Sequence, residues 1–214
     1  MRTIAVIARK GGSGKSTVAV QLAVAAHRRG RRVLVADSDP QRSATVALRG
    51  RSDPGPDVGE TDAGDLYAQQ VAARNAGYDL MIIDTPAVLE DELAQAIVIS
   101  DLSLLVIRPT FLDLAAILRT AEIIRRLRKP GLLVLNQAPV AREGVEPGAV
   151  VRALEALKLM RLPVAPVILR SRAGYQTGLE AGRSVEETAP NSPAAQELSE
   201  LWAYVGRFLF GKDA

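Results

Sequence analysis

The sequence contains no cysteine and only one histidine, His27. Without cysteine the chain forms no disulfides, no thiolate metal sites and no cysteine-held iron–sulfur clusters. A single histidine likewise excludes a metal site that is built from several histidines. Any chemistry of this protein must therefore be carried by other side chains or by the backbone.

Long apolar runs are missing as well. No stretch approaches the roughly 20 residues that a membrane-spanning helix needs. An apolar strand pattern begins almost at Met1, which leaves no room for a secretory signal, so we expect a cytoplasmic protein. Hydrophobic residues make up 48% and charged residues 24% of the 214 residues, as in ordinary globular proteins, and we expect one domain over residues 1–214.

The two halves of the chain differ in charge, although the net charge is only +3. Residues 1–107 carry 12 basic and 13 acidic side chains, whereas residues 108–214 carry 15 basic and 11 acidic ones. Arginine supplies 22 of the 27 cations. Two explanations stay open: a face that binds a polyanion, because arginine holds phosphate through two hydrogen bonds, or the codon usage of a GC-rich genome.

Apolar, β-branched runs alternate along the chain with segments of helical periodicity. The apolar runs predict strands at 2–8, 31–37, 78–86, 101–109, 131–137 and 162–169. The periodic segments predict helices at 16–30, 64–76, 91–99, 111–128, 147–159 and 194–209. We therefore expect an α/β fold with a mostly parallel, twisted sheet that is covered by helices on both faces. Ligands of such sheets bind beyond the carboxyl ends of the strands.

Two segments of this pattern contain residues that interrupt regular structure. Pro163 and Pro166 place the last predicted strand near a sheet edge or shorten it. Residues 49–64 are rich in glycine, proline and aspartate, so they predict a surface loop with room for a short edge strand inside it. This loop is too short to mark a domain boundary.

A glycine-rich stretch, ARKGGSGKST at residues 8–17, lies between the first predicted strand and the first predicted helix. Its three glycines permit backbone angles that turn successive N–H groups toward one anion, and the helix N-terminus adds partial positive charge. In such a loop Lys15 would reach the β- and γ-phosphates of a nucleotide, and the Ser16 hydroxyl would ligate Mg²⁺. The candidate nucleotide-binding residues here are Lys10, Gly11, Gly12, Ser13, Gly14, Lys15, Ser16 and Thr17.

The stretch departs at one position from the general P-loop pattern, which has glycine where this chain has Arg9. We keep two interpretations of Arg9: a further contact to phosphate or to a partner, or a surface side chain. A glycine-rich turn with incidental lysines is the alternative to the P-loop itself. The strand before the stretch and the helix after it favour the P-loop.

Three aspartates lie at the ends of predicted strands. Asp84 ends the run LMIID, while Asp37 and Asp39 lie at the end of RVLVADSD. Because the carboxyl ends of parallel strands meet at one edge of a sheet, we expect all three near the phosphate loop. A magnesium nucleotide needs such carboxylates, so Ser16, Asp39 and Asp84 are the candidate metal ligands. Asp37 could instead serve mainly to hold its loop.

Three motifs together resemble a known family. KGGSGKST at 10–17, DSDPQRSAT at 37–45 and IIDTP at 82–86 are similar to the signatures of the ParA/MinD family of deviant Walker A P-loop ATPases. Residues 167–202 also resemble the C-terminal pattern of ParA-like proteins, so the resemblance extends over nearly the whole chain. The length resembles that of small ParA proteins without an N-terminal DNA-binding domain.

The resemblance implies an ATPase that uses ATP and Mg²⁺ and works as an ATP-dependent homodimer. In the family the first lysine of the loop, here Lys10, reaches the phosphates that the other subunit holds, where a second cation stabilises the transferring group. Asp39 matches the residue that positions water, so Lys10, Lys15 and Asp39 are the candidate catalytic set. Hydrolysis is expected to be slow and stimulated by a partner. Asn136 falls where adenine is read, although asparagine after a strand is also common in turns.

The first functional hypothesis is an ATPase for plasmid or chromosome segregation or for the positioning of intracellular cargo. The resemblance implies that the ATP dimer binds DNA without sequence preference, associates with the nucleoid, and is released when a ParB-like or adaptor protein stimulates hydrolysis. Arg170 and Arg172 match family positions implicated in DNA contact, but such arginines also form surface or interface pairs. Residues 125–129, RRLRK, are a second basic candidate, although cations at a helix C-terminus also complement its dipole.

The alternative hypothesis is a MinD-like, membrane-associated positioning ATPase that uses its C-terminal helix. In residues 200–214, five apolar side chains share one helical face and two cations flank it: Leu201, Trp202, Val205, Phe208 and Leu209, with Arg207 and Lys212. A last helix packed on the sheet gives the same pattern, and two cations are few for anionic lipid, so membrane binding is the weaker hypothesis. A redox relative such as the nitrogenase iron protein is excluded, because the chain has no cysteine to hold its cluster.

Overall fold

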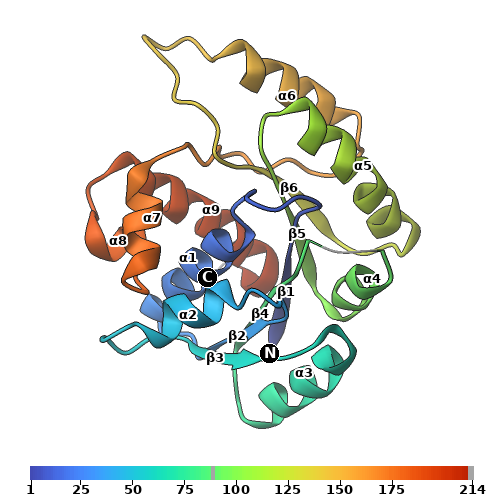
Figure 1. Ribbon diagram of the computed structural model, residues 1–214, viewed down its shortest axis with the longest axis vertical. Helices are drawn as coiled ribbons and strands as arrows, with labels where there is room; N and C mark the ends of the chain where they lie inside the picture. Colours follow the sequence, from blue (N-terminus) through green and yellow to red (C-terminus); the bar gives the residue numbers. More distant parts are fainter. Residues whose placement is uncertain (88–89, 212–214) are drawn as a thin grey trace.

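The structure, a computed structural model, describes residues 1–87 and 90–211, and of residues 90–92 it describes the backbone only. Within these residues the chain forms one six-stranded sheet with the strand order β3-β2-β4-β1-β5-β6 (Figure 1). Each pair of neighbouring strands is parallel. The strands are β1 Arg2–Ile7, β2 Val33–Asp37, β3 Asp57–Glu60, β4 Leu80–Asp84, β5 Leu102–Ile107 and β6 Gly131–Leu135.

Helices cover both faces of this sheet, which confirms the expected α/β fold. Figure 1 shows α1, α2, α7, α8 and α9 on one side and α3, α4, α5 and α6 on the other. The helices are α1 Lys15–Arg28, α2 Ser43–Arg49, α3 Leu66–Asn75, α4 Glu90–Ile99, α5 Phe111–Arg126, α6 Gly148–Lys158, α7 Ala173–Glu180, α8 Val185–Thr188 and α9 Pro193–Phe210, with a short 3₁₀ helix, η1, at Ala63–Asp65.

The central strands supply both cores because their side chains alternate between the two faces. In β1, Ile4 and Val6 belong to the core that includes α1 and α9, whereas Ala5 and Ile7 belong to the opposite core. Because both faces of the central strands are buried, their sequences are continuous apolar runs and do not alternate between apolar and polar residues.

The strand order brings the functional candidates to one edge of the sheet. β4 lies between β1 and β2, and Asp84 at the end of β4 is the register partner of Asp37 at the end of β2. Residues 8–14 follow the end of β1, directly beside them. The carboxyl edge of β1, β4 and β2 is therefore the place where the glycine-rich loop meets the aspartates.

Residues 162–169 do not form the regular strand that their apolar pattern predicts. They run beside β6, where the Leu133 N–H donates to the Pro163 carbonyl at 2.8 Å. The Ala165 N–H donates to the Leu133 carbonyl at 2.8 Å and the Leu169 N–H donates to the Leu135 carbonyl at 3.0 Å, but these contacts give only isolated bridges, in keeping with an edge segment that contains two prolines. The sixth strand is instead β3, the short edge strand for which residues 49–64 had room.

The sequence pattern missed three helices, α2, α7 and α8. Each has eight residues or fewer. Such segments are too short to show a helical period, so local pattern alone does not reveal them.

The last helix, α9, turns its apolar face inward against α1, which contradicts the basis of the membrane hypothesis. Phe208 is 54% exposed. The other four apolar residues of that face are at most 3% exposed: Leu201, Trp202, Val205 and Leu209. Lys212 lies outside the described residues. Within residues 1–87 and 90–211, no helix combines the length and the apolar character that a bilayer crossing requires.

Candidate functional site

The loop between β1 and α1 has the geometry of an anion site. Gly12 and Gly14 have positive φ angles of 72° and 90°, which favour glycine. A Cβ on Gly14 would also lie 2.4 Å from Asn136 Nδ2, so a larger residue there would push the Asn136 side chain out of its place. The first turn of α1 has neither a side-chain cap nor an acidic residue. Its N–H groups and its partial positive charge are therefore open to an anion.

A cavity of about 450 Å³ opens beside this loop. The start of α1, the loop after β2 and the residues after β4 form its walls. The structure thus brings Lys15, Ser16 and Asp39 to one cavity, from two segments that are far apart in sequence. Gly11, Gly12, Gly14 and Thr17 line the same cavity.

Two ionisable groups at this end of the sheet are buried with few partners. Lys15 is 6% exposed, and the described residues offer it no hydrogen bond and no ion pair within 4 Å. Asp84 is fully buried, and within the described part of the chain neither of its carboxyl oxygens has a hydrogen bond of good geometry, although the Ser16 hydroxyl and Lys15 are near enough to act on its pKa. Burying unpaired charges is costly. The folded chain therefore holds one unsatisfied cation and one unsatisfied carboxyl group for a ligand.

Burial raises the pKa of the Asp84 carboxyl to about 7. The Ser16 hydroxyl and the charge of Lys15 lower this pKa partway, whereas the charges of Asp37 and Asp39 raise it. Asp84 is therefore close to half ionised at neutral pH in the free protein. A cation bound beside it would favour the ionised form.

The oxygen atoms that could ligate a metal at this point of the site fit Mg²⁺. The Ser16 hydroxyl and the unsatisfied Asp84 oxygens are hard oxygen ligands, which Mg²⁺ prefers. No three histidine, aspartate or glutamate side chains of the described residues converge on one point. A magnesium ion held by Ser16 and Asp84 would therefore depend on phosphate oxygens and water for the rest of its shell.

The two aspartates after β2 have different surroundings. Asp37 is fully buried, and its Oδ2 accepts hydrogen bonds from the N–H and the hydroxyl of Thr45, both at 2.8 Å. This carboxylate therefore holds its loop and the start of α2. Asp39 is half-buried and lines the 450 Å³ cavity beside the loop between β1 and α1, which we call the phosphate cavity. Its Oδ1 accepts a hydrogen bond from the Gln41 N–H at 2.9 Å. Among the described residues its Oδ2 has no hydrogen-bond donor, so Asp39 keeps an oxygen for a ligand or a water.

Lys10 lies at the start of the same loop but does not line the cavity that holds Lys15. It is half-buried and forms no hydrogen bond or ion pair with a described residue. The two lysines thus differ in place: Lys15 faces the cavity of its own chain, and Lys10 does not. Ser13, between them, is 2% exposed and contributes its carbonyl to the support of the loop.

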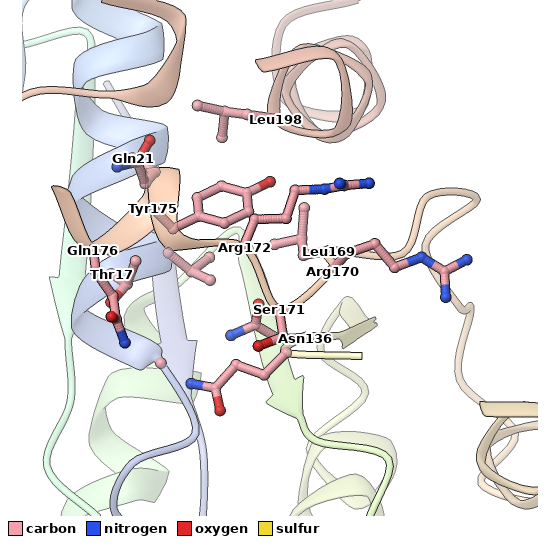
Figure 2. Close-up of a pocket in the computed structure, with 13 residues that line it drawn as sticks. Thr17, Gln21, Asn136, Leu169, Arg170, Ser171, Arg172, Tyr175, Gln176 and Leu198 are labelled. Carbon is pink, nitrogen blue, oxygen red and sulfur yellow. The ribbon is translucent and has the colours of Figure 1, made fainter. Parts of the chain in front are cut away.

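A second, smaller pocket of about 140 Å³ lies on the other side of the loop (Figure 2). Thr17 and Gln21 of α1, Tyr175 of α7 and Leu198 of α9 contribute to its walls. Its mixed apolar and polar lining, next to a phosphate site, suits the base and sugar of a nucleotide.

Asn136, which follows β6, borders this second pocket and also supports the loop. Its Nδ2 donates to the Ser13 carbonyl at 2.8 Å. The neighbouring Gln137 Nε2 donates to the Gly12 carbonyl at 3.1 Å. Gln137 has a positive φ of 51°, which is uncommon outside glycine, and this loop-supporting residue was missed in the sequence. Contact between Asn136 and adenine stays a prediction.

The two predicted DNA-contacting arginines are already paired with carboxylates. Arg170 donates from both terminal nitrogens to Glu146, at 2.9 Å for one of them, and this pairing holds the pKa of Glu146 below its usual value. Arg172 Nε donates to Glu197 at 2.8 Å. Figure 2 shows both guanidinium groups pointing away from Thr17 and Asn136. DNA contact by these arginines stays a prediction, and it would have to compete with the pairs.

The other basic candidate, residues 125–129, forms the end of α5. Arg125 and Arg126 are exposed in its last turn, where their charges complement the helix dipole. Lys129 Nζ donates to the Ser100 carbonyl at 3.4 Å. The structure therefore provides a structural reason for Arg125, Arg126 and Lys129 without any ligand.

Comparison with known proteins places these features in context. Residues 4–182 match a family described as the CobQ/CobB/MinD/ParA nucleotide binding domain. The chain is 31% identical to maintenance of carboxysome distribution protein A of Halothiobacillus neapolitanus, over 93% of this chain and 94% of that protein. It is 29% identical to the chromosome-partitioning ATPase Soj of Thermus thermophilus, over 94% of each. The septum site-determining protein MinD of Pyrococcus horikoshii, solved with Mg-ADP, has the same fold, with a TM-score of 0.77 at 21% identity over 100% of this chain and 98% of that one.

Proposed function

This chain belongs to the CobQ/CobB/MinD/ParA nucleotide-binding family, and on that premise we propose that it is an ATPase that segregates DNA or positions an intracellular cargo. The buried site between the start of α1 and the end of β4 carries the proposal, because Lys15 and Asp84 are buried there without a hydrogen bond of good geometry from the described residues. ATP with Mg²⁺ supplies what each group lacks: phosphate oxygens for Lys15 and a cation for Asp84. The similarity to a chromosome-partitioning ATPase and to a carboxysome-distribution protein supports the role in positioning.

Within this proposal each group has a separate task. The glycine loop and the N-terminus of α1 hold the phosphates, and Lys15 stabilises their charge. Bound Mg²⁺ would neutralise further phosphate charge. Asp39 orients the attacking water through Oδ2, while its Oδ1 fixes its own loop. Asn136 supports the loop and borders the base, so it couples the two pockets.

Lys10 acts on the nucleotide of a second copy of the chain. The proposal rests on its position outside its own phosphate cavity and on the family to which the chain belongs. A cation supplied across an interface makes ATP binding and dimerisation one event. A single ATPase domain over residues 1–214 is sufficient for this cycle.

DNA is the surface on which the ATP-bound dimer works, and its contacts include Arg170 and Arg172. Each arginine must share or leave a carboxylate, so one subunit binds weakly and pairing doubles the contacts. The ATP-bound protein is then associated with the nucleoid. A ParB-like or adaptor protein ends the association by stimulating hydrolysis.

Fluorescence anisotropy of two unrelated labelled duplexes tests this function, with no nucleotide, with ADP and with a non-hydrolysable ATP analogue. We expect binding only with the analogue, similar affinity for both duplexes and a steep fall with salt, because phosphate contacts carry no sequence information and release counterions. Cosedimentation with anionic liposomes under the same conditions supplies the opposing arm. Liposome binding without DNA binding would contradict the DNA role, and absence of nucleotide binding would contradict the whole proposal.

A further inference from the structure

The loop that carries Asp39 ends at a residue with an unusual backbone. Arg42 has φ 52° and ψ 34°, which is the left-handed region, at the residue that precedes α2. Glycine adopts this conformation freely, whereas another residue there is strained and persists only where its surroundings hold it. The contacts of the Arg42 side chain are therefore the place to look for the reason.

The Arg42 guanidinium lies between the ends of β2 and β3. Its Nη1 donates to the carbonyls of Asp37 and Thr61, the latter at 2.9 Å. Its Nη2 lies 3.5 Å from Asp62 Oδ1, and its Nε lies 3.7 Å from Glu60 Oε2. The register of β2 and β3 ends at Asp37 and Glu60, so the guanidinium caps the two strands where they separate.

These contacts fix the loop that contains Asp39 from its far end. The Arg42 N–H donates to the Asp39 carbonyl at 2.9 Å, and the Asp39 N–H donates to Asp37 Oδ1 at 3.2 Å. The loop is thus tied to β2 through Asp37 at one end and to the β2–β3 edge through Arg42 at the other. Asp39 itself faces the phosphate cavity from the middle of this tied segment.

We infer that Arg42 is a positioning residue for ATP hydrolysis, which holds the loop of Asp39 so that its carboxylate faces the attacking water. The inference rests on the proposed function, since it acts through Asp39. It also gives a role to Glu60 and Asp62, two acidic residues at the end of β3 that receive the guanidinium. If the loop of Asp39 becomes mobile, its carboxylate is positioned less often for the attacking water, so the rate of hydrolysis falls. Nucleotide binding changes less, because the P-loop holds the nucleotide independently.

Arg42→Gly tests the inference, because glycine accepts the left-handed backbone without strain while the arginine side chain and its guanidinium are removed. We expect kcat for ATP to fall about tenfold or more while KM changes by less than about twofold. Arg42→Lys, which retains the charge but not the fork of donors, should show an intermediate kcat. The matched control is Arg49→Ala: Arg49 also pairs with Glu60, at 2.8 Å, but lies at the end of α2. Its kcat should equal that of the wild type.

A second comparison shows whether Arg42 acts through Asp39. In an Asp39→Ala background, Arg42→Gly should cause no further loss of the residual rate, measured with isotope-labelled ATP. An equal loss in both backgrounds would overturn the inference, and so would an unchanged kcat in Arg42→Gly. If Arg42→Gly fails to fold in thermal melts, a wild-type kcat in Arg42→Lys would overturn it in the same way. The proposed function fails separately, through a wild type that does not hydrolyse ATP or an Asp39→Ala variant of full activity.

Discussion

The phosphate loop and the segment at residues 170–172 are both basic, but they treat their charges in opposite ways. Lys15 is buried without an ion pair within 4 Å among the described residues, whereas Arg170 and Arg172 are each paired with a glutamate. A ligand at the first site completes a set of unsatisfied groups. A ligand at the second must displace or share pairs that the chain has already made.

This difference predicts two kinds of binding. An unpaired buried charge leaves a large free-energy gain for the ligand that satisfies it, so the nucleotide site should be tight and selective. The two arginine–glutamate pairs are part-buried, and a polyanion gains only what remains after it displaces or shares them, so the arginine segment should bind weakly and, because phosphate contacts release counterions, in a salt-sensitive way. The predictions that follow either break or sharpen this contrast, from the largest expected effect to the smallest.

Lys15→Ala removes the unpaired cation and should abolish ATP binding, with a loss of at least about 100-fold in affinity, since hydrogen bonds to charged groups count most in a buried site. Titration with a fluorescent ATP analogue measures this. Lys10→Ala is the matched control within the same loop: it should bind ATP almost normally but lose the ATP-dependent dimer in size-exclusion chromatography. A Lys10→Ala protein that dimerises like the wild type would rule out its role across the interface.

Asp39→Ala should bind ATP and dimerise but hydrolyse ATP on the order of 100-fold more slowly, because the P-loop retains the nucleotide while the water loses its orienting group. The result would be a trapped dimer, visible as a long-lived species in size-exclusion chromatography with ATP. Turnover at the wild-type rate would show that Asp39 is only a loop residue. In that case another group would orient the attacking water, and the contrast between Lys15 and the paired arginines would be unaffected.

The raised pKa of Asp84 predicts a pH dependence of nucleotide binding. Its value of about 7 means that the carboxyl group is ionised above pH 7 and protonated below it. Affinity for the magnesium nucleotide should therefore fall as the pH drops from 8 to 6, by up to about tenfold per pH unit below the pKa. Asp84→Asn should bind the magnesium nucleotide weakly and lose the part of the pH dependence that comes from Asp84. The pH dependence that remains in this variant would belong to the titration of the nucleotide.

The ligand-free protein offers an independent readout of the same group. Because the folded pKa of Asp84 is raised from 3.8 to about 7, its contribution to stability is fully present below about pH 4 and is lost progressively as the pH rises from about 4 to about 7. Asp84→Asn should therefore raise the melting temperature most at pH 8 and change it little at about pH 4. A difference in melting temperature between the two proteins that does not change with pH would show that the Asp84 carboxyl group does not titrate in this pH range.

The smallest effect should come from releasing an arginine from its partner. Glu146→Gln removes the carboxylate that pairs with Arg170, so affinity for DNA with the ATP analogue should rise a few-fold at low salt. Arg170→Glu should lower it, on the order of tenfold, with dimerisation intact. Anisotropy over a salt series measures both. Unchanged DNA affinity in both variants would show that Arg170 does not contact DNA. Residues 170–172 would then have no known ligand to compare with the nucleotide at the phosphate loop.

The sequence by itself determined the fold class and indicated the loop that we propose as the phosphate site. The alternation of apolar runs and helical segments is a local signal, and it identified five of the six strands. The order of glycines, Lys15 and Ser16 in one loop is local as well, and Asp84 was found because it ends an apolar strand. These features depend on neighbours along the chain, so their pattern is readable before folding.

Only the tertiary structure decided which charges are free and which faces are buried. Arg170 meets Glu146, which lies 24 residues away, and Asn136 meets the Ser13 carbonyl at a separation of 123 residues. The apolar face of α9 is covered by α1, and the sixth apolar run, which contains Pro163 and Pro166, follows the edge of β6 through isolated bridges without forming a regular strand. Pairing and burial depend on which distant segments the chain path brings together, whereas a sequence pattern reports only the residue types that are available to meet.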